Sequence, residues 1–369
     1  MRRSNDARLA LPLAEWPEAD RAAWRAARTC AGLFAENGAA ARWKPKTAKQ
    51  VEKGYALWLG FLGRRGLLDP GALPGARLTE PNLRPYVADL QCRVAPQTIV
   101  SRLRDLSVAV RVMDPGADRS LLQRALRRLS RDAVPRRDKR ARLVTPRRLR
   151  DAGLARMARV QTEHHPKIDV TAGRYRDGLM MALLACVPVR LGELARMRLG
   201  HHLRKAGERY LLAYDPGETK AGRPTEVELP MMLTPWFDRY LEIYRPVLLR
   251  GQSSDAVWIS TYRDAMSEHT ISLRFCAATR EEIGMEINPH LARDIVATGI
   301  AEERPDLVGI LPMVLDHADD RTVQKYYNHA RRLVASRVYS AEMLAQVKEA
   351  LAGPAQDSER NKERHPCAP

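Results

Sequence analysis

The sequence predicts a mainly α-helical protein of two domains, with a small antiparallel β-sheet in the second domain. The chain has 369 residues, enough for a sizeable hydrophobic core in each domain. Apolar residues recur at helical spacing along most of it, and the clearest example is a segment containing Val51, Tyr55, Trp58, Leu59, Phe61 and Leu62. Only residues 210–229 look like short strands around a turn rich in glycine and proline.

The first half is predicted to contain an N-terminal extension and a four-helix domain. Residues 1–42 are rich in alanine and in charge, with one short helix. The domain proper spans 43–133, with helices expected over 47–66, 82–92, 95–113 and 119–132. Pro-Gly turns at Asp69 and Asp114 and the Thr79-Glu-Pro helix start separate these helices.

The second half is predicted to be one larger domain, over residues 146–352, that follows a linker at 134–145. Helices are expected over 146–160, 175–187 and 192–197, then strands at 210–214 and 226–229. From Pro235 the pattern favours helix almost to the end of the chain. Residues 353–369 are polar and have little to bury, so this tail is expected to be disordered.

The charge balance indicates a polyanionic partner. Lys and Arg number 62 against 44 Asp and Glu, which gives a net charge of +18. Between Arg119 and Arg150 there are 13 basic residues and two acidic ones. Such a block would repel itself in isolation, so the basic helix and linker are expected to lie along a phosphate backbone.

Other sequence features argue against metal, cofactor and membrane classes. The five cysteines include no Cys-x-x-Cys pair, which indicates reduced intracellular thiols rather than a disulfide framework or a zinc site. No Gly-x-x-x-x-Gly-Lys loop and no signal-length or membrane-length apolar run are present. We expect no cofactor and no metal. Five other histidines form no recognisable ligand spacing and are interpreted as surface or structural residues: His164, His165, His201, His202 and His269.

Four short segments of the second half contain residues suited to phosphodiester chemistry. A guanidinium matches phosphate oxygens, a phenol can attack phosphorus, an ammonium can protonate a leaving oxygen, and imidazoles can donate to developing charge. The candidate residues are Arg190, Lys220, His290, Arg293, His317 and Tyr327, with Glu193 placed to hold the Arg190 guanidinium.

In this order and spacing, the set resembles the tyrosine recombinase, or phage integrase, family. The resemblance covers roughly Leu179 to Ala341. The stretch His290-Leu-Ala-Arg-Asp-Ile-Val-Ala-Thr and the ending Tyr327-Asn-His-Ala are similar to a large proteobacterial integrase subgroup.

The resemblance implies a clamp of two domains around double-stranded DNA, with 43–133 as the core-binding domain. It implies that Tyr327 attacks phosphorus, that Lys220 is the general acid, and that the arginines and histidines stabilise the transition state. The expected product is a 3′-phosphotyrosine, made without metal or ATP by a homotetramer on paired sites. A second recombinase or a directionality factor is a further candidate partner, and the expected location is the cytoplasm, at the nucleoid.

The nucleophile has two candidates. A count of nine residues from His317, a common family spacing, gives Tyr326, whereas the local pattern Tyr-Asn-x-Ala gives Tyr327, which we favour. Adjacent helical residues point about 100° apart, so only one of the two can face the phosphate.

Three departures from the family pattern leave other functions open. Val187-Pro188-Val189 replaces a common Thr-Gly ahead of Arg190, Asp316 replaces a glycine, and Asp294 stands where histidine is frequent. The first two keep open a catalytically impaired DNA-binding accessory or regulatory protein. A type IB topoisomerase-like relaxing enzyme, which uses the same chemistry, is a further alternative. An amphipathic helix over 340–351 could pack on its own domain or on a neighbouring protomer.

Overall fold

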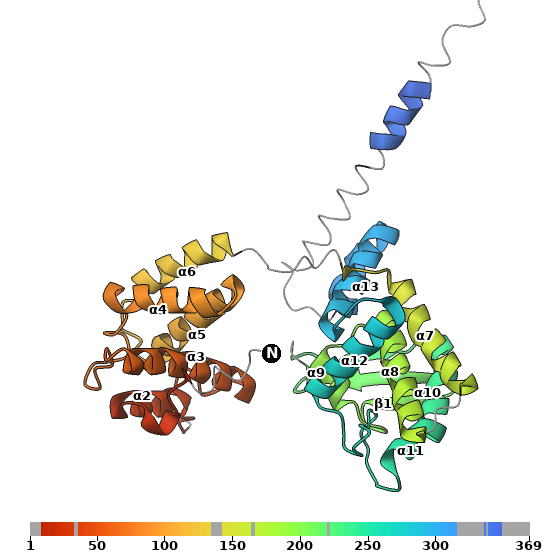
Figure 1. Cartoon of the computed structure of the whole chain (residues 1–369), viewed down its shortest axis with the longest axis horizontal. Helices are drawn as coiled ribbons and strands as arrows, with labels where there is room; N and C mark the ends of the chain where they lie inside the picture. The colour runs from red at the N-terminus through yellow and green to blue at the C-terminus, as the bar shows by residue number, and fades with distance from the viewer. Residues whose placement is uncertain are drawn as a thin grey trace, which may run out of the picture. The chain divides into compact units, whose positions relative to one another are not determined.

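The computed structural model describes residues 9–32, 36–133, 142–163, 167–219, 222–315, 336 and 339–348. The chain forms two compact units, Met1–Asp138 and Lys139–Pro369 (Figure 1). The expected fold class is confirmed, because the described part is mainly helical and contains one antiparallel three-stranded sheet. The predicted tail at 353–369 and most of the basic linker lie outside the described residues.

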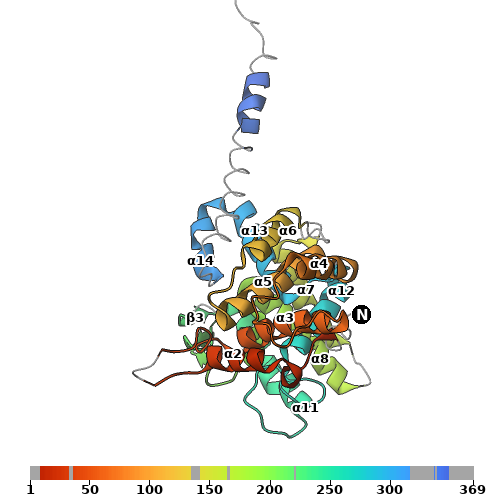
Figure 2. The same cartoon turned by 90° about the vertical axis from the view of Figure 1, so that its left-hand side faces the viewer.

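The described part of the first unit consists of helices and the loops that connect them (Figure 2). Four of its helices lie within a few residues of the ranges expected from apolar spacing. The helical elements are η1 (Leu13–Glu15), α2 (Glu18–Arg28), α3 (Pro45–Arg64), α4 (Glu80–Arg93), α5 (Pro96–Met113) and α6 (Ser120–Asp132).

The core of the first unit is rich in aromatic side chains. Trp58 of α3 meets Tyr86 of α4 edge to face, with ring centroids 4.9 Å apart. Trp16 and Trp24 are buried in the same core, so part of the segment assigned to an N-terminal extension packs with the four-helix domain. A buried ion pair of 2.8 Å between Arg77 and Asp20 connects α2 to the chain ahead of α4.

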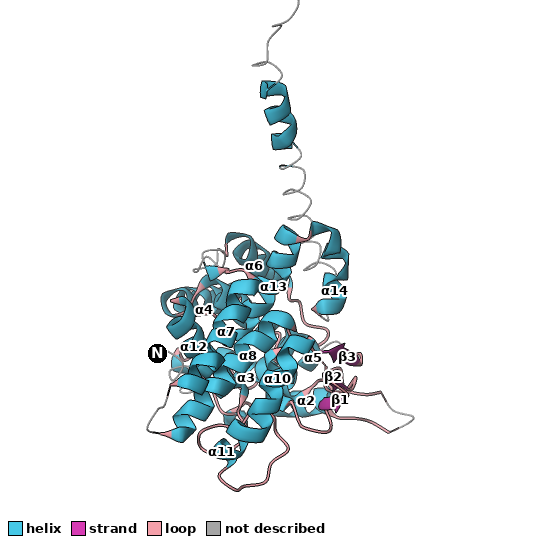
Figure 3. Cartoon of the chain, turned by 90° about the vertical axis from the view of Figure 1, so that its right-hand side faces the viewer, coloured by secondary structure: helices cyan, strands magenta, loops and turns pink. Residues whose placement is uncertain are grey.

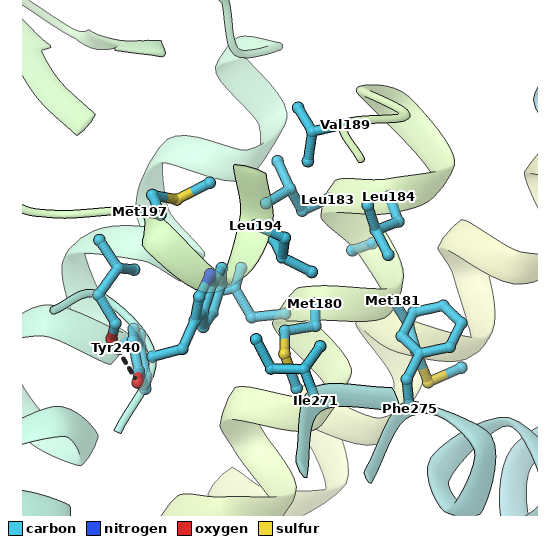
Figure 4. Packing of buried hydrophobic residues seen from close by; sticks show 14 of the residues in the cluster. Met180, Met181, Leu183, Leu184, Val189, Leu194, Met197, Tyr240, Ile271 and Phe275 are labelled. Atoms are coloured by element: carbon cyan, nitrogen blue, oxygen red, sulfur yellow. Dashed lines mark hydrogen bonds between the residues drawn. The ribbon is translucent and has the colours of Figure 1, made fainter. Parts of the chain in front are cut away.

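The second unit is built around α8 (Ile168–Cys186), a helix that is buried on nearly all sides between Tyr175 and Ala185. Met180, Met181 and Leu184 of α8 pack with residues of the neighbouring helices (Figure 4). The elements packed around α8 include α7 (Pro146–Thr162), α11 (Arg245–Leu249), α12 (Glu268–Ile283), α13 (Pro289–Glu303) and a π-helical turn, η4 (Tyr240–Tyr244).

Helix α7 lies very close to α8 because two glycines face each other. A Cβ placed on Gly153 would lie 2.6 Å from the carbonyl oxygen of Gly178, and one on Gly178 would lie 2.8 Å from the Gly153 oxygen. Both distances are shorter than real Cβ contacts, so the interface requires glycine at both positions.

The sheet contains β1 (Leu203–Ala206), β2 (Arg209–Tyr214) and β3 (Thr225–Glu228), in the order β1-β2-β3 (magenta in Figure 3). Leu203 of β1 and Val227 of β3 both lie opposite Leu212 of β2. On β2 the side chains of Tyr210, Leu212 and Tyr214 face the core, as period-two alternation requires. Two of these strands were predicted from the sequence, and β1 was not.

The prediction of nearly continuous helix after Pro235 is wrong over residues 250–267. Arg250 and Gly251 both have positive φ, which ends α11, and the segment then forms isolated bridges instead of a helix. The remaining short elements are α9 (Leu191–Arg196), η3 (Met231–Leu233), α10 (Thr234–Arg239), η5 (Pro305–Ile310) and α14 (Leu311–Val314). Residues 339–348 are helical, and Tyr339, Leu344 and Val347 are exposed.

Candidate active site

Arg190 stands at the start of α9, directly after the three residues that follow α8. Its backbone N–H donates to Glu193 Oε2 at 2.9 Å, and its Nη1 donates to Glu193 Oε1 at 3.1 Å. The Arg190 side chain is 19% exposed, whereas the carboxylate of Glu193 is buried. Glu193 therefore fixes the guanidinium at the surface of the unit, as the sequence predicted.

Arg293 lies in the first half of α13 and is buried. Its Nη1 donates to the carbonyl oxygen of Pro188, and its Nη2 donates to the carbonyl oxygen of Leu315. Pro188 lies two residues before Arg190, and Leu315 lies two residues before His317. One side chain thus connects the segments that lead into two other predicted site residues.

The contact with Pro188 bears on a departure from the family pattern. Because Arg293 binds the main-chain oxygen, the contact does not depend on the side chain at position 188. Val187 and Val189 on either side are buried in the core. The departure at positions 187–189 therefore leaves the acceptor for Arg293 in place.

His290 lies one helical turn before Arg293 and is exposed. The helix start predicted at Asn288-Pro289 is confirmed, because Asn288 Oδ1 accepts a 2.9 Å hydrogen bond from the Leu291 N–H and Pro289 is the first helical residue. The structure therefore holds His290 at the accessible end of α13.

The turn between β2 and β3 is closed by its own residues. The hydroxyl of Thr219 donates to the Arg223 carbonyl oxygen at 2.8 Å and accepts from the Arg223 N–H at 3.1 Å. Gly222 adopts a positive φ of 69°, which favours glycine. Lys220 itself lies outside the described residues, as do His317, Tyr326 and Tyr327.

The same turn is tied to α9 by contacts that the sequence did not reveal. Tyr214, the last residue of β2, donates from its hydroxyl to the Glu193 carbonyl oxygen at 2.8 Å. Arg196 Nη2 donates to the Glu218 carbonyl oxygen at 2.5 Å. Burial is the main cause that raises the pKa of Tyr214 above its usual range, and the nearby charge of Glu193 raises it further. This phenol therefore stays a neutral donor.

His201, His202 and Glu218 form a cluster whose ligand-type atoms all lie within 4.8 Å of one another. The distance from His202 Nε2 to Glu218 Oε1 is 2.9 Å, and His202 Nδ1 accepts from the Arg198 N–H at 3.1 Å. A neutral imidazole that accepts at Nδ1 has its proton on Nε2. The Nε2 lone pair that a metal would need is therefore absent in this tautomer, and the residues present do not fit a metal site.

Through its contact with Pro188, the buried Arg293 lies close to the segment that leads into the partly exposed Arg190 and its partner Glu193. Both guanidiniums are held in place by oxygens of the protein, a carboxylate for Arg190 and two main-chain carbonyls for Arg293. A family model described as Phage integrase family matches residues 147–332, which is half of the chain. The chain belongs to this family of tyrosine recombinases.

Curated relatives match over less than half of the chain. The chain is 29% identical over 167 residues to tyrosine recombinase XerD of Pseudomonas aeruginosa, covering 45% of this chain and 53% of the relative. It is 27% identical over 158 residues to tyrosine recombinase XerC of Pseudomonas savastanoi pv. phaseolicola, covering 41% and 48%. The chain thus spans about half the length of the curated relatives it matches.

Two solved structures align with most of this chain. A crystal structure of XerA recombinase aligns over 81% of this chain and 94% of its own, with 16% identity and a TM-score of 0.39. A lambda integrase dimer bound to a COC′ core site aligns over 78% and 73%, with 16% identity and a TM-score of 0.45. Within the described residues, no helix is both long and apolar enough to span a membrane.

Proposed function

We propose that this protein is a site-specific DNA recombinase or integrase that cuts and rejoins strands through a 3′-phosphotyrosine intermediate. The observation that supports the proposal most is the position of Arg293, which contacts the segment before Arg190 and the segment before His317. Membership of the phage integrase family supports the same reaction. Residues 290–298 and 327–330 favour the proteobacterial integrase subgroup.

In the proposed reaction, the hydroxyl oxygen of Tyr327 attacks phosphorus and the bond from phosphorus to the 5′ oxygen breaks. Lys220 donates a proton to the leaving 5′ oxygen, and His290 is the candidate acceptor of the tyrosine proton. Arg190 and Arg293 bind the non-bridging oxygens, and His317 donates a hydrogen bond to one of them. A 5′ hydroxyl from another strand reverses these steps, so no metal or ATP is required.

The proposed partner is double-stranded DNA, bound by a homotetramer on paired sites at the nucleoid. The exposed arginines of α6 would contact phosphates, since cationic side chains that neutralise phosphates release condensed counterions into solution. A second recombinase or a directionality factor would act with this assembly.

The proposal is tested by covalent capture on a nicked suicide duplex. The duplex contains the DNA that flanks the mobile element on which an integrase of this kind would act. Wild type is expected to give a protein–DNA band that resists denaturant, and Tyr327→Phe is expected to give none. Loss of the band only in Tyr326→Phe would move the nucleophile by one residue. Tight, specific binding without a band from any form would overturn the enzyme proposal in favour of a DNA-binding accessory protein. Relaxation of supercoiled DNA that needs only one site would favour the alternative of a type IB topoisomerase-like enzyme.

A further inference from the structure

The two residues that precede Lys220 are held by an interaction network centred on Glu218. Glu218 Oε1 accepts from His202, Oε2 accepts from the Asp215 N–H at 3.1 Å, and the main-chain oxygen accepts from Arg196. Thr219, the residue that immediately precedes Lys220, is buried and bonded across the turn to Arg223. The chain therefore reaches position 220 through restrained residues, and Arg223 beyond the turn is held to Thr219.

His202 is built into the fold as a donor to Glu218. Its side chain is only 2% exposed, and each ring nitrogen has a partner: Arg198 N–H at Nδ1 and Glu218 at Nε2. The ring also lies against Tyr214, with centroids 4.8 Å apart. These contacts define one tautomer and one ring orientation, which is what a positioning group requires.

The network also reaches the Arg190 segment. The Tyr214 ring contacts His202, while the Tyr214 hydroxyl donates to the carbonyl oxygen of Glu193, whose carboxylate holds Arg190. A continuous set of contacts thus joins the residue that orients one phosphate-binding guanidinium to the turn that contains Lys220.

We propose that the hydrogen bond from His202 to Glu218 is a positioning element that sets Lys220 for proton donation to the leaving 5′ oxygen. The proposal rests on the proposed recombinase function and adds a residue that does not touch DNA. Loss of the bond would leave DNA binding and nucleophilic attack intact while it misplaces the general acid. A general acid must lie within hydrogen-bond reach of the leaving oxygen, so a small displacement of the turn slows cleavage.

Two substitutions of His202 separate the roles of its ring nitrogens. Asparagine places an acceptor near the position of Nδ1, so His202→Asn retains the hydrogen bond with Arg198 and removes the donor to Glu218. Glutamine places a donor near the position of Nε2, so His202→Gln retains the donor to Glu218 and removes the acceptor for Arg198. The pair is matched in polarity, and both lack the ring.

The experiment measures single-turnover covalent cleavage of two suicide substrates, one with an ordinary 5′ oxygen and one with sulfur at the bridging position. A thiolate leaves without a proton, so the sulfur substrate needs no general acid. On the oxygen substrate His202→Asn is expected to be about tenfold slower than wild type, as loss of one hydrogen bond to a charged group implies. On the sulfur substrate its rate should return to that of wild type, and His202→Gln should cleave both normally.

Lys220→Ala is the reference, because it removes the proposed acid itself. If sulfur restores Lys220→Ala but His202→Asn is slow on both substrates, or normal on both, the positioning role is overturned and the recombinase function stands. If wild type forms no covalent complex, or sulfur does not restore Lys220→Ala, the proposed mechanism fails and the positioning role fails with it. DNA affinity, measured in parallel, is expected to be unchanged in every variant except Lys220→Ala.

Discussion

The guanidinium of Arg293 donates to the carbonyl oxygen of Leu315, and its other terminal nitrogen donates to that of Pro188. These acceptors lie on segments far from each other in the sequence, and both lead into predicted site residues. A buried arginine in this position has a structural role as well as a proposed role at the phosphate. The two roles make different predictions for stability and for chemistry.

Arg293→Ala is expected to destabilise the protein and to abolish cleavage. Removal of the guanidinium leaves two carbonyl oxygens without this donor in a buried site, at a cost of about 2–4 kcal/mol. The free energy of unfolding is measured in urea. Arg304→Ala is the control, because Arg304 is exposed and pairs with Asp306 at the surface, where an ion pair contributes little to stability. Equal stability of the two variants would contradict the structural role of Arg293.

The contact between α7 and α8 predicts a second stability effect. Gly153→Ala would place a Cβ against the Gly178 carbonyl oxygen, so the helices must separate, at a cost of about 2–3 kcal/mol. Gly309→Ala is the matched control, since an added Cβ there meets no atom within 4 Å. Urea midpoints of both variants check the prediction, and a Gly153→Ala protein as stable as wild type would show that the helices do not approach so closely.

Much of this fold could be predicted because a buried helix face requires apolar residues at helical spacing in the sequence. The observed bounds of helices α3, α5 and α7 agree closely with the bounds expected from that spacing. Strand β1 shows almost no such pattern in the sequence, because only Leu203 of its four residues is buried. The apolar run at 256–259 looked helical, but a short buried run fits extended backbone equally well.

The contacts of the candidate site also fall into two groups, those that the sequence could predict and those that it could not. The contact between Arg190 and Glu193 could be predicted, since the two residues are three apart at a helix start. The bonds from Tyr214 to Glu193 and from His202 to Glu218 could not, because they depend on how β2 and its turn meet α9. Sequence spacing contains no information on such contacts.

The first unit is expected to contribute to DNA binding through α6. Arg124 and Arg128 are exposed and four residues apart, so they share one face of the helix. Their replacement by Gln is expected to lower the slope of log affinity against log salt by about 0.9 for each phosphate that the protein no longer neutralises. Arg84→Gln is the control, because the Arg84 guanidinium is already paired with Glu80 on α4. An unchanged slope in the α6 variant would place the phosphate-binding residues elsewhere.

The network at Glu218 predicts how stability depends on pH. Burial alone would raise the pKa of Glu218, but hydrogen bonds from His202 and the Asp215 N–H outweigh it and hold the pKa below its usual value of 4.5. A carboxyl group with a lowered pKa in the folded state stabilises the protein fully above its unfolded value. That stabilisation disappears as the pH falls through the lower, folded-state pKa.

Glu218→Gln should therefore melt below wild type at about pH 6, and the difference should shrink once the pH falls below 4.5. Melting curves over this range measure the effect, with Glu226→Gln on the exposed face of β3 as the control. A difference that stays constant down to the acid limit would mean that the charge of Glu218 does not matter. The stabilisation would then come from packing of the side chain alone, and the donor role of His202 would have no charged acceptor to act on.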